Sequence, residues 1–304
     1  MNNIFLFNNN IMVEKKIPAN YCAPCSEGAK YKKEKDKDKN NSKNTCYSTT
    51  SLLKIIKAWN QKYITNKIIL DEKQKNNKSY LWKLVQQKLS SSCHNNEKCW
   101  KEQEFIKKMK DTEIEFYTFK PTYPKEWLQN KYTWLNTYDI LHVMKQYEKL
   151  YKNFMFLGPV PADCPTKINC ELSNLSLTKL HKNGIDNVGI IYNLDMSYQG
   201  GSHWVAMFID IKNNEINYYD STASMPTPLI KKFIVNMGNK ILKKNKDVKV
   251  IYNDKKHQYG GSECGVYSMN FILERLSGVS MYEISNMKIP DEGMNHLRKI
   301  LYSV

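Results

Sequence analysis

Cys264 lies where the start of a helix could activate a thiol. It ends the segment Gly260-Gly261-Ser262-Glu263-Cys264, and apolar residues at helical spacing follow from Val266 onward. The unpaired N–H groups of a first helical turn favour the thiolate, which is the nucleophilic form of cysteine. The glycines beside it let a substrate backbone come close. The alternative is a small buried hydrophobic residue, the usual role of a cysteine beside a helix.

Three further residues have the side chains that a cysteine nucleophile needs. His203 precedes a predicted strand at 204–209 and would act as the base. Asp220 ends the next predicted strand, so a hairpin would bring its carboxylate to the imidazole and fix the tautomer. Gln258, six residues before Cys264, has an amide that can donate into an oxyanion hole together with the Cys264 N–H. This set predicts acyl transfer without a metal or organic cofactor.

Hydrophobic periodicity predicts the elements that must position these residues. Apolar or alternating runs typical of strands occur at 188–192, 204–209, 216–219 and 248–252. Helical spacing of apolar residues occurs at 140–147, at 230–242 and after Cys264. The sequence therefore predicts an α+β fold with a central mixed sheet flanked by helices.

The composition also predicts an N-terminal accessory domain. Apolar residues recur at helical spacing over 52–59 and 80–89, which indicates a mostly helical domain over residues 1–117. Residues 26–45 are almost wholly polar and charged and are expected to form a mobile loop. Residues 118–304 then form the catalytic domain.

The eight cysteines are expected to be reduced thiols. The first residues lack the apolar region of a signal peptide, and no stretch approaches the ~20 apolar residues of a membrane span, so we expect a soluble, non-secreted protein. Zinc binding by the cysteines between Cys22 and Cys99, with His94, is an alternative. Their irregular spacing matches no standard zinc finger, so no metal site is expected.

The charge balance predicts a polyanionic partner. The chain has 46 Lys and Arg against 30 Asp and Glu, a net charge of +16. Such a surface attracts nucleic acid, which could also stimulate the enzyme, and the lysine-rich stretches 30–43 and 240–249 are the expected contacts. The alternative is a genome-wide compositional bias in which the lysines only keep exposed faces solvated.

Together these residues resemble a known family. His-Trp at a strand start (203–204), Tyr-Tyr-Asp-Ser at the next strand end (218–221) and Gln-x5-Cys-Gly opening a helix (258–265) are similar to the ubiquitin-like-protein proteases. That family includes the SUMO deconjugases and the adenovirus protease, which uses DNA as a cofactor. The order His, Asp, Gln, Cys matches the family, whereas papain-like enzymes have the cysteine first. Trp134-Leu135-Asn136 resembles the family's Trp-Leu-Asn-Asp segment, with Thr137 where Asp is usual.

The nearer resemblance is to the polyprotein maturation proteases of large nucleocytoplasmic DNA viruses, of the African swine fever virus type. It rests on His-Trp-Val-Ala (203–206), Asp-Ser-Thr (220–222) and Glu-Cys-Gly-Val-Tyr-Ser (263–268), and it covers about residues 118–304. The African swine fever virus enzyme has Asn at the third catalytic position, where this chain has Asp220. The resemblance implies an endopeptidase that processes viral structural polyproteins at Gly-Gly-Xaa sites during virion maturation. Its location would be the viral factory in the host cytoplasm, and the virion.

The resemblance also implies substrate-binding residues. In the family two tryptophans close a tunnel over the substrate, and Trp134 and Trp204 match their positions, with Glu263 expected beside them. Two facing indoles leave space for backbone only, which selects Gly-Gly; the alternative is two core tryptophans. Another candidate substrate is a ubiquitin-like modifier of the SUMO type. A catalytically silent binding module is disfavoured because all four catalytic residue types are present.

Overall fold

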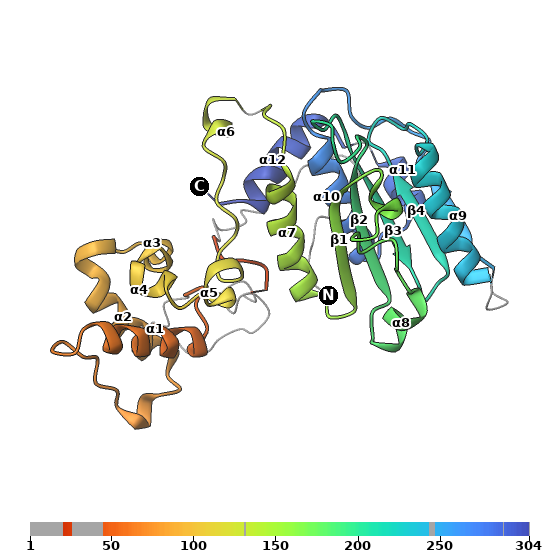
Figure 1. Cartoon of the computed structure of the whole chain (residues 1–304). Helices are drawn as coiled ribbons and strands as arrows, with labels where there is room; N and C mark the ends of the chain where they lie inside the picture. Colours follow the sequence, from red (N-terminus) through yellow and green to blue (C-terminus); the bar gives the residue numbers. More distant parts are fainter. Residues whose placement is uncertain (1–20, 26–44, 131, 243–246, 288, 304) are drawn as a thin grey trace. The chain divides into compact units, whose positions relative to one another are not determined.

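The computed structural model describes residues 21–25, 45–130, 132–242, 247–287 and 289–303. These residues form two compact units (Figure 1): one contains the residues up to Thr122 together with Ser303, and the other extends from Tyr123 to Tyr302. The boundary expected after residue 117 lies close to this division. The expected loop at 26–45 lies outside the described residues, except for Thr45, which is buried.

The larger unit is built on a sheet of five strands in the order β1-β2-β3-β4-β5. The strands are β1 (Phe154–Pro161), β2 (Asn187–Asn193), β3 (Trp204–Asp210), β4 (Glu215–Tyr219) and β5 (Lys249–Tyr252). Strands β2, β3 and β4 pair antiparallel, while β1 pairs parallel with β2 and β5 pairs parallel with β4. The predicted α+β fold with a mixed sheet is thus confirmed.

Helices cover both faces of this sheet (Figure 1). The helices of this unit are α6 (Glu126–Gln129), which lies away from the sheet, α7 (Thr137–Leu150), α8 (Leu177–Lys182), α9 (Pro228–Leu242), α10 (Cys264–Leu276), α11 (Met281–Asn286) and α12 (Asp291–Leu301), with the 3₁₀ turn η3 (Cys164–Thr166). Successive side chains of β3 pack on opposite faces of the sheet: Trp204, Ala206 and Phe208 pack in the cluster with α7, α10 and α12, whereas the residues between them pack with α9. Because both faces are covered, the central strands read as almost continuous apolar runs.

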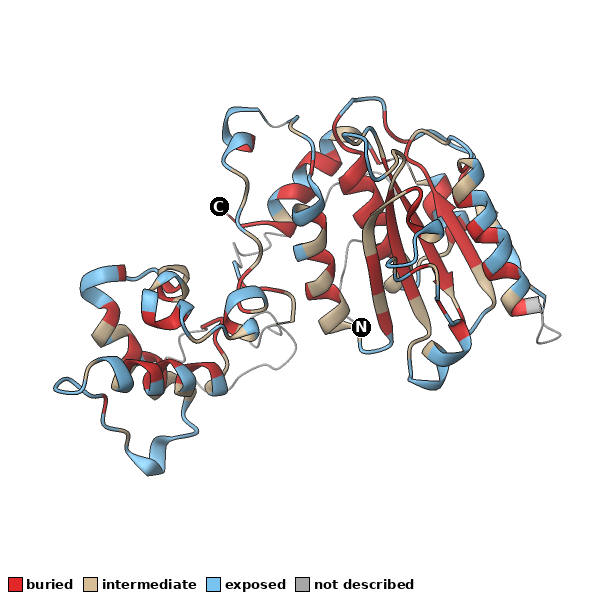
Figure 2. Cartoon of the chain, viewed as in Figure 1, coloured by how far each residue is buried: buried red, intermediate tan, exposed pale blue. Residues whose placement is uncertain are grey.

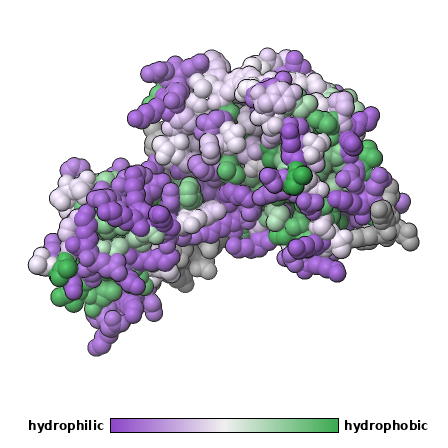
Figure 3. Space-filling model, viewed as in Figure 1, coloured by the Kyte–Doolittle hydropathy of each residue, from purple (hydrophilic) through white to green (hydrophobic). Residues whose placement is uncertain are grey.

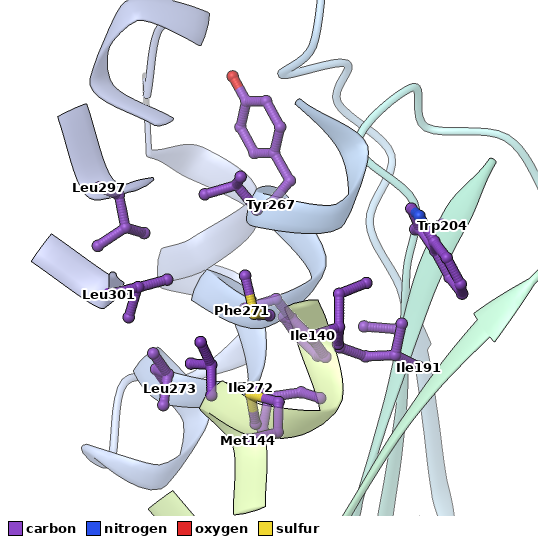
Figure 4. Close-up of a cluster of buried hydrophobic side chains, with 14 of the residues drawn as sticks. Ile140, Met144, Ile191, Trp204, Tyr267, Phe271, Ile272, Leu273, Leu297 and Leu301 are labelled. Carbon is purple, nitrogen blue, oxygen red and sulfur yellow. The ribbon is translucent and has the colours of Figure 1, made fainter. Parts of the chain in front are cut away.

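The cluster beneath α10 forms the core on one side of the sheet. Figure 4 shows Ile140 and Met144 from α7 meeting Phe271 and Ile272 from α10, with Ile191 from β2 close by. Figure 2 shows that α10 and the central strands are buried over most of their length. Helix α10 is apolar on nearly all sides, as expected for a helix that is buried on nearly all sides.

The smaller unit is helical, as predicted. Its helices are α1 (Thr49–Lys62), α2 (Lys78–Cys93), α3 (Glu97–Glu102), α4 (Glu104–Lys107) and α5 (Thr112–Phe116), with the 3₁₀ turn η2 (Glu72–Gln74). Its core contains the buried carboxylate of Glu97. This carboxylate accepts hydrogen bonds from the Thr45 hydroxyl, the Cys46 N–H and the Trp82 indole. These donors satisfy a charge that would otherwise be costly to bury.

The expectation of eight reduced thiols is wrong for six of them. Disulfides join Cys22 to Cys46, Cys93 to Cys99 and Cys164 to Cys170, with Cα–Cα distances of 5.2, 5.4 and 5.5 Å. These separations lie within the range of protein disulfides. The expectation of reduced thiols was inferred from the cellular compartment. The compartment does not indicate which cysteines lie close together in the folded chain. Cys25 and Cys264 lie outside the disulfides.

Within the described ranges, no group of three or more His, Cys, Asp or Glu side chains is arranged to hold a metal ion. In the same part of the chain, no helix is both long enough and apolar enough to cross a membrane.

Glu274 on α10 is a buried acid, and we expect it to make stability depend on pH. Burial raises the pKa of its carboxyl from 4.5 to about 8, and neither of its carboxylate oxygens has a hydrogen-bond partner. The folded state therefore holds this proton more tightly than the unfolded chain. The free energy of unfolding should fall as the pH rises from 4.5 to about 8.

Glu274→Gln should remove this contribution and raise the melting temperature most at alkaline pH. Calorimetry of both proteins across the pH range measures the effect, with the exposed Glu171→Gln as the matched control. A constant difference between Glu274→Gln and wild type at all pH values would contradict the assignment.

Candidate active site

His203 and Asp220 meet at one end of an antiparallel strand pair. His203 directly precedes β3, Asp220 directly follows β4, and the register pairs Ala206 with Tyr219. The His203 Nε2 atom lies 2.8 Å from Asp220 Oδ1. The carboxylate is fully buried, while the His203 side chain keeps 19% of its surface exposed. This geometry fixes the imidazole on the sheet and leaves it reachable from solvent.

Asp220 is held from two sides. Its Oδ1 atom also accepts hydrogen bonds from the Thr222 N–H and hydroxyl, each at 2.8 Å. Its backbone is bound by the Asn253 side chain, which accepts from the Asp220 N–H at 2.9 Å and donates to the Asp220 carbonyl at 2.6 Å. Asn253 follows β5, and sequence reasoning missed it because no local pattern links it to Asp220.

Cys264 is the first residue of α10, as its position before the apolar run predicts. Its side chain is 2% exposed. Burial lowers the pKa of His203, but hydrogen bonds to Asp220 and Cys264 and the charges of both outweigh burial and raise that pKa to about 9. The imidazole is therefore protonated at neutral pH and lies in contact with the thiol. A cation in this place stabilises negative charge on sulfur.

This pair predicts the alkaline limit of activity. The imidazolium must give its proton to the leaving amine, so kcat/KM should fall as pH rises through about 9. In Asp220→Asn the anionic partner that raises the His203 pKa is lost, and the limit should move to lower pH. Rate profiles of both proteins between about pH 6 and 10 measure this shift. Coincident profiles would show that Asp220 does not set the His203 pKa.

Gln258 lies in the loop that leads to Cys264 and is bound to Ser221, the residue after Asp220. Its Oε1 atom accepts from the Ser221 hydroxyl at 2.6 Å, and its Nε2 atom donates to the Gly260 carbonyl at 2.9 Å. The backbone N–H groups of His257 and Gln258 both donate to the Ser221 carbonyl. The Gln258 amide nitrogen has two protons, so one remains for an oxyanion after the bond to Gly260. Its role in the oxyanion hole stays a prediction.

Gln258→Ala should lower kcat by roughly 10²–10³-fold with little change in KM, the usual cost of one lost oxyanion donor. Steady-state kinetics on a peptide substrate measure this effect. The exposed Gln129→Ala is the matched control, because it removes the same side chain from α6 in the same unit and should leave kcat unchanged. Unchanged kcat in Gln258→Ala would remove Gln258 from the site.

A second histidine, His257, directly precedes Gln258 in the chain. The Tyr219 hydroxyl lies 2.8 Å from His257 Nδ1, and His257 Nε2 lies 3.2 Å from the Ser285 carbonyl. Burial lowers the pKa of His257, which favours the neutral ring. A neutral ring donates to Ser285 through Nε2 and accepts from Tyr219 through Nδ1. His257 therefore supports the loop as a structural residue.

Trp204 is hydrogen-bonded to Leu135, the residue after Trp134, close to Cys264. The buried Trp204 indole donates to the Leu135 carbonyl at 3.0 Å, and Trp134 is 44% exposed. A Cβ atom placed on Gly265 would lie 3.1 Å from Leu135 and 3.2 Å from Trp204. The structure thus brings Trp204, Leu135 and the residue after Cys264 into contact, with Trp134 open to solvent.

Glu263 is not placed to bind substrate, and this expectation is corrected. Its side chain is 1% exposed, and its carboxylate accepts from the Ser262 N–H, the Ser262 hydroxyl and the Asn295 amide. The motif places Glu263 beside the nucleophile but does not indicate whether its side chain points outward. Glu263 instead organises the turn that leads into α10.

Comparison with known proteins gives consistent matches. Residues 182–303 match the catalytic domain of the Ulp1 protease family. Over 280 residues the chain is 35% identical to a protein of Acanthamoeba polyphaga mimivirus that carries the name of a thiol protease, covering 87% of this chain and 90% of the relative. It is 30% identical over 129 residues to a cysteine protease of African swine fever virus, covering 41% of this chain and 47% of that protein.

The fold is similar to a solved viral structure as well. The crystal structure of an African swine fever virus protease superposes with a TM-score of 0.60 at 20% identity, covering 94% of this chain and 96% of that one. The similarity therefore includes the helical N-terminal region, beyond the part that the family match covers.

Proposed function

Because the chain belongs to the Ulp1 family of cysteine proteases, we propose that it is an endopeptidase that processes viral structural polyproteins at Gly-Gly-Xaa sites during virion maturation. Its similarity to proteases of two large DNA viruses supports the viral setting. The same proposal places the enzyme in the viral factory of the host cytoplasm and in the virion.

The observation that carries the specificity is the close packing beside the nucleophile. In the chain, Trp204 comes directly after His203, and Leu135 comes directly after Trp134. Both Trp204 and Leu135 lie within contact distance of a Cβ atom placed on Gly265. A substrate passing between the two tryptophans has space for its backbone and little for side chains. Glycine residues before the scissile bond fit this restriction.

The proposed reaction is acyl transfer in two steps. The Cys264 thiolate attacks the substrate carbonyl carbon and forms a tetrahedral oxyanion, which Gln258 and backbone N–H groups stabilise. His203 gives its proton to the leaving amine, and the thioester remains on Cys264. Neutral His203 then takes a proton from water, which attacks the thioester and releases the new carboxyl terminus. Asp220 holds the imidazole throughout.

A set of matched peptides tests the proposal. Replacing either glycine of a Gly-Gly-Xaa peptide by alanine should lower kcat/KM by roughly 10–200-fold, the range for one methyl group in a close-fitting site. Cleavage of Ala-containing peptides at the same rate would show that the tryptophans do not restrict the substrate. A modifier precursor ending in Gly-Gly is the competing substrate. Faster processing of that precursor than of a capsid peptide would make the enzyme a SUMO-type deconjugase.

We also propose nucleic acid as a polyanionic partner that can stimulate the enzyme. The net charge of +16 supports it, and hydrophilic side chains cover much of the face in Figure 3. The stretch 30–43 lies outside the described residues, as does 243–246 within the second stretch. Binding of random duplex DNA that weakens steeply between about 50 and 200 mM salt would support this partner. Absence of binding at the lower salt would exclude it.

A further inference from the structure

Three polar side chains of α12 bind the loop that leads to the nucleophile. Asp291, Asn295 and Arg298 are spaced i, i+4 and i+7, which places them on one face of the helix. Each contacts a different part of residues 258–264, the nucleophile loop, which ends at Cys264. None of the three belongs to the catalytic set described above.

Asp291 joins the loop to the catalytic helix. Its Oδ2 atom accepts from the backbone N–H groups of Tyr259 at 3.0 Å and Gly260 at 2.6 Å. Its Oδ1 atom accepts from the hydroxyl of Tyr267 on α10 at 3.0 Å. Gly260 is also the residue whose carbonyl holds the Gln258 amide. One carboxylate therefore fixes the turn that positions Gln258 relative to α10.

Asn295 and Arg298 hold the end of the loop that is closer to Cys264. The Asn295 amide donates to Glu263 at 3.1 Å, and the Arg298 guanidinium donates to the Ser262 carbonyl at 2.8 Å. Arg298 is completely buried, and a second of its nitrogens donates at 2.6 Å to the carbonyl of Thr133, the residue before Trp134. The same side chain thus binds the nucleophile loop and the segment expected to cover the substrate.

These contacts fix peptide orientation, which matters for an oxyanion hole. A trans peptide is planar, so the carbonyl of one residue and the N–H of the next point in opposite directions. Binding the Ser262 carbonyl to Arg298 therefore sets the direction of the Glu263 N–H, one residue before Cys264. Oxyanion stabilisation depends on donors that are oriented before the reaction begins.

We propose that Asp291, Asn295 and Arg298 form a positioning face on α12 that orients the oxyanion donors of the nucleophile loop. This inference rests on the proposed protease chemistry. The three side chains act through Gln258 and the loop backbone and do not touch the substrate carbonyl. They should therefore affect acyl transfer and leave the reactivity of the Cys264 thiolate unchanged.

Asp291→Ala tests this separation with two readouts on the full chain. Peptide hydrolysis requires the oxyanion donors, whereas alkylation of Cys264 by iodoacetamide forms an S–C bond and releases iodide without any oxyanion. We expect kcat to fall roughly 10²-fold, as for a misplacement of about 1 Å, with KM and the alkylation rate nearly unchanged. Asp291→Asn should restore part of kcat, because its amide oxygen still accepts from the loop N–H groups.

Two further variants keep the test decisive. Asn295→Ala removes a single hydrogen bond to Glu263 and replaces Asp291→Ala as the test variant if Asp291→Ala does not fold. In Asn295→Ala, kcat should fall while the alkylation rate of Cys264 stays nearly unchanged. The exposed Lys299→Ala, on the same helix, is the control and should match wild type. A parallel loss of hydrolysis and alkylation would make the contacts merely structural, and full hydrolysis in Asp291→Ala would also overturn the inference. Failure of wild-type protein to cleave any Gly-Gly peptide would instead refute the proposed function.

Discussion

Cys264→Ser is expected to lower kcat/KM by at least about 10⁴-fold while the protein stays folded. A serine hydroxyl keeps its proton at neutral pH, and a protonated imidazole beside it cannot remove that proton. In the wild type, burial lowers the pKa of His203, and the bonds and charges of Asp220 and Cys264 outweigh burial and raise it to about 9. The bond to Asp220 does not involve residue 264 and still favours the imidazolium in the variant. Hydrolysis of a Gly-Gly-Xaa peptide by the variant and by wild type measures the loss.

Cys25→Ser is the matched control for this experiment. Cys25 is the other cysteine outside the disulfides and lies in the smaller unit, so its replacement should leave kcat/KM unchanged. Thiol-directed alkylation followed by mass spectrometry should label Cys264 before Cys25 in the wild type. Retention of near-normal hydrolysis in Cys264→Ser, or preferential labelling of Cys25, would reject Cys264 as the nucleophile.

His203→Ala should lower kcat/KM by roughly 10³–10⁴-fold, the upper part of the range for an acid–base group. The loss is large because one imidazole both stabilises the thiolate and protonates the leaving amine. Unlike the variants of the nucleophile loop, His203→Ala should slow alkylation of Cys264 as well as hydrolysis. The two rates, measured at one pH, therefore distinguish the base from an oxyanion donor.

The exposed His296→Ala on α12 is the control for the histidine substitution. It changes the same residue type in the same unit and should leave both rates unaltered. If His203→Ala alkylates as fast as wild type, the imidazole does not activate Cys264, and another group must do so.

Local patterns predict the parts of the site that depend on neighbouring elements. The pairing of β3 with β4 follows from two short strand-like segments, one of them continuously apolar, with a short connection, and it brings His203 next to Asp220. The start of α10 at Cys264 follows from the apolar run after the glycines. Both features are set by interactions close in sequence, which periodicity can show.

Other parts depend on contacts between distant residues and could not be predicted. Asn253 binds the Asp220 backbone across the β4–β5 pair, and Arg298 binds Thr133, which is 165 residues away. Hydrophobic periodicity does not predict strand β1, because Gly158-Pro159 interrupts its apolar run. The register of β1 with β2 also shifts at this point. The disulfides were missed because cysteine pairing is a property of the folded chain.

The position of α12 in chain order has a consequence for synthesis. His203, Asp220, Gln258 and Cys264 all precede α12, whose side chains hold the nucleophile loop. A chain emerging from the ribosome therefore has its whole catalytic set before it has the helix that orders it. We expect the nascent protein to reach full activity only after α12 has docked, so that peptide cleavage begins after synthesis of the enzyme is complete.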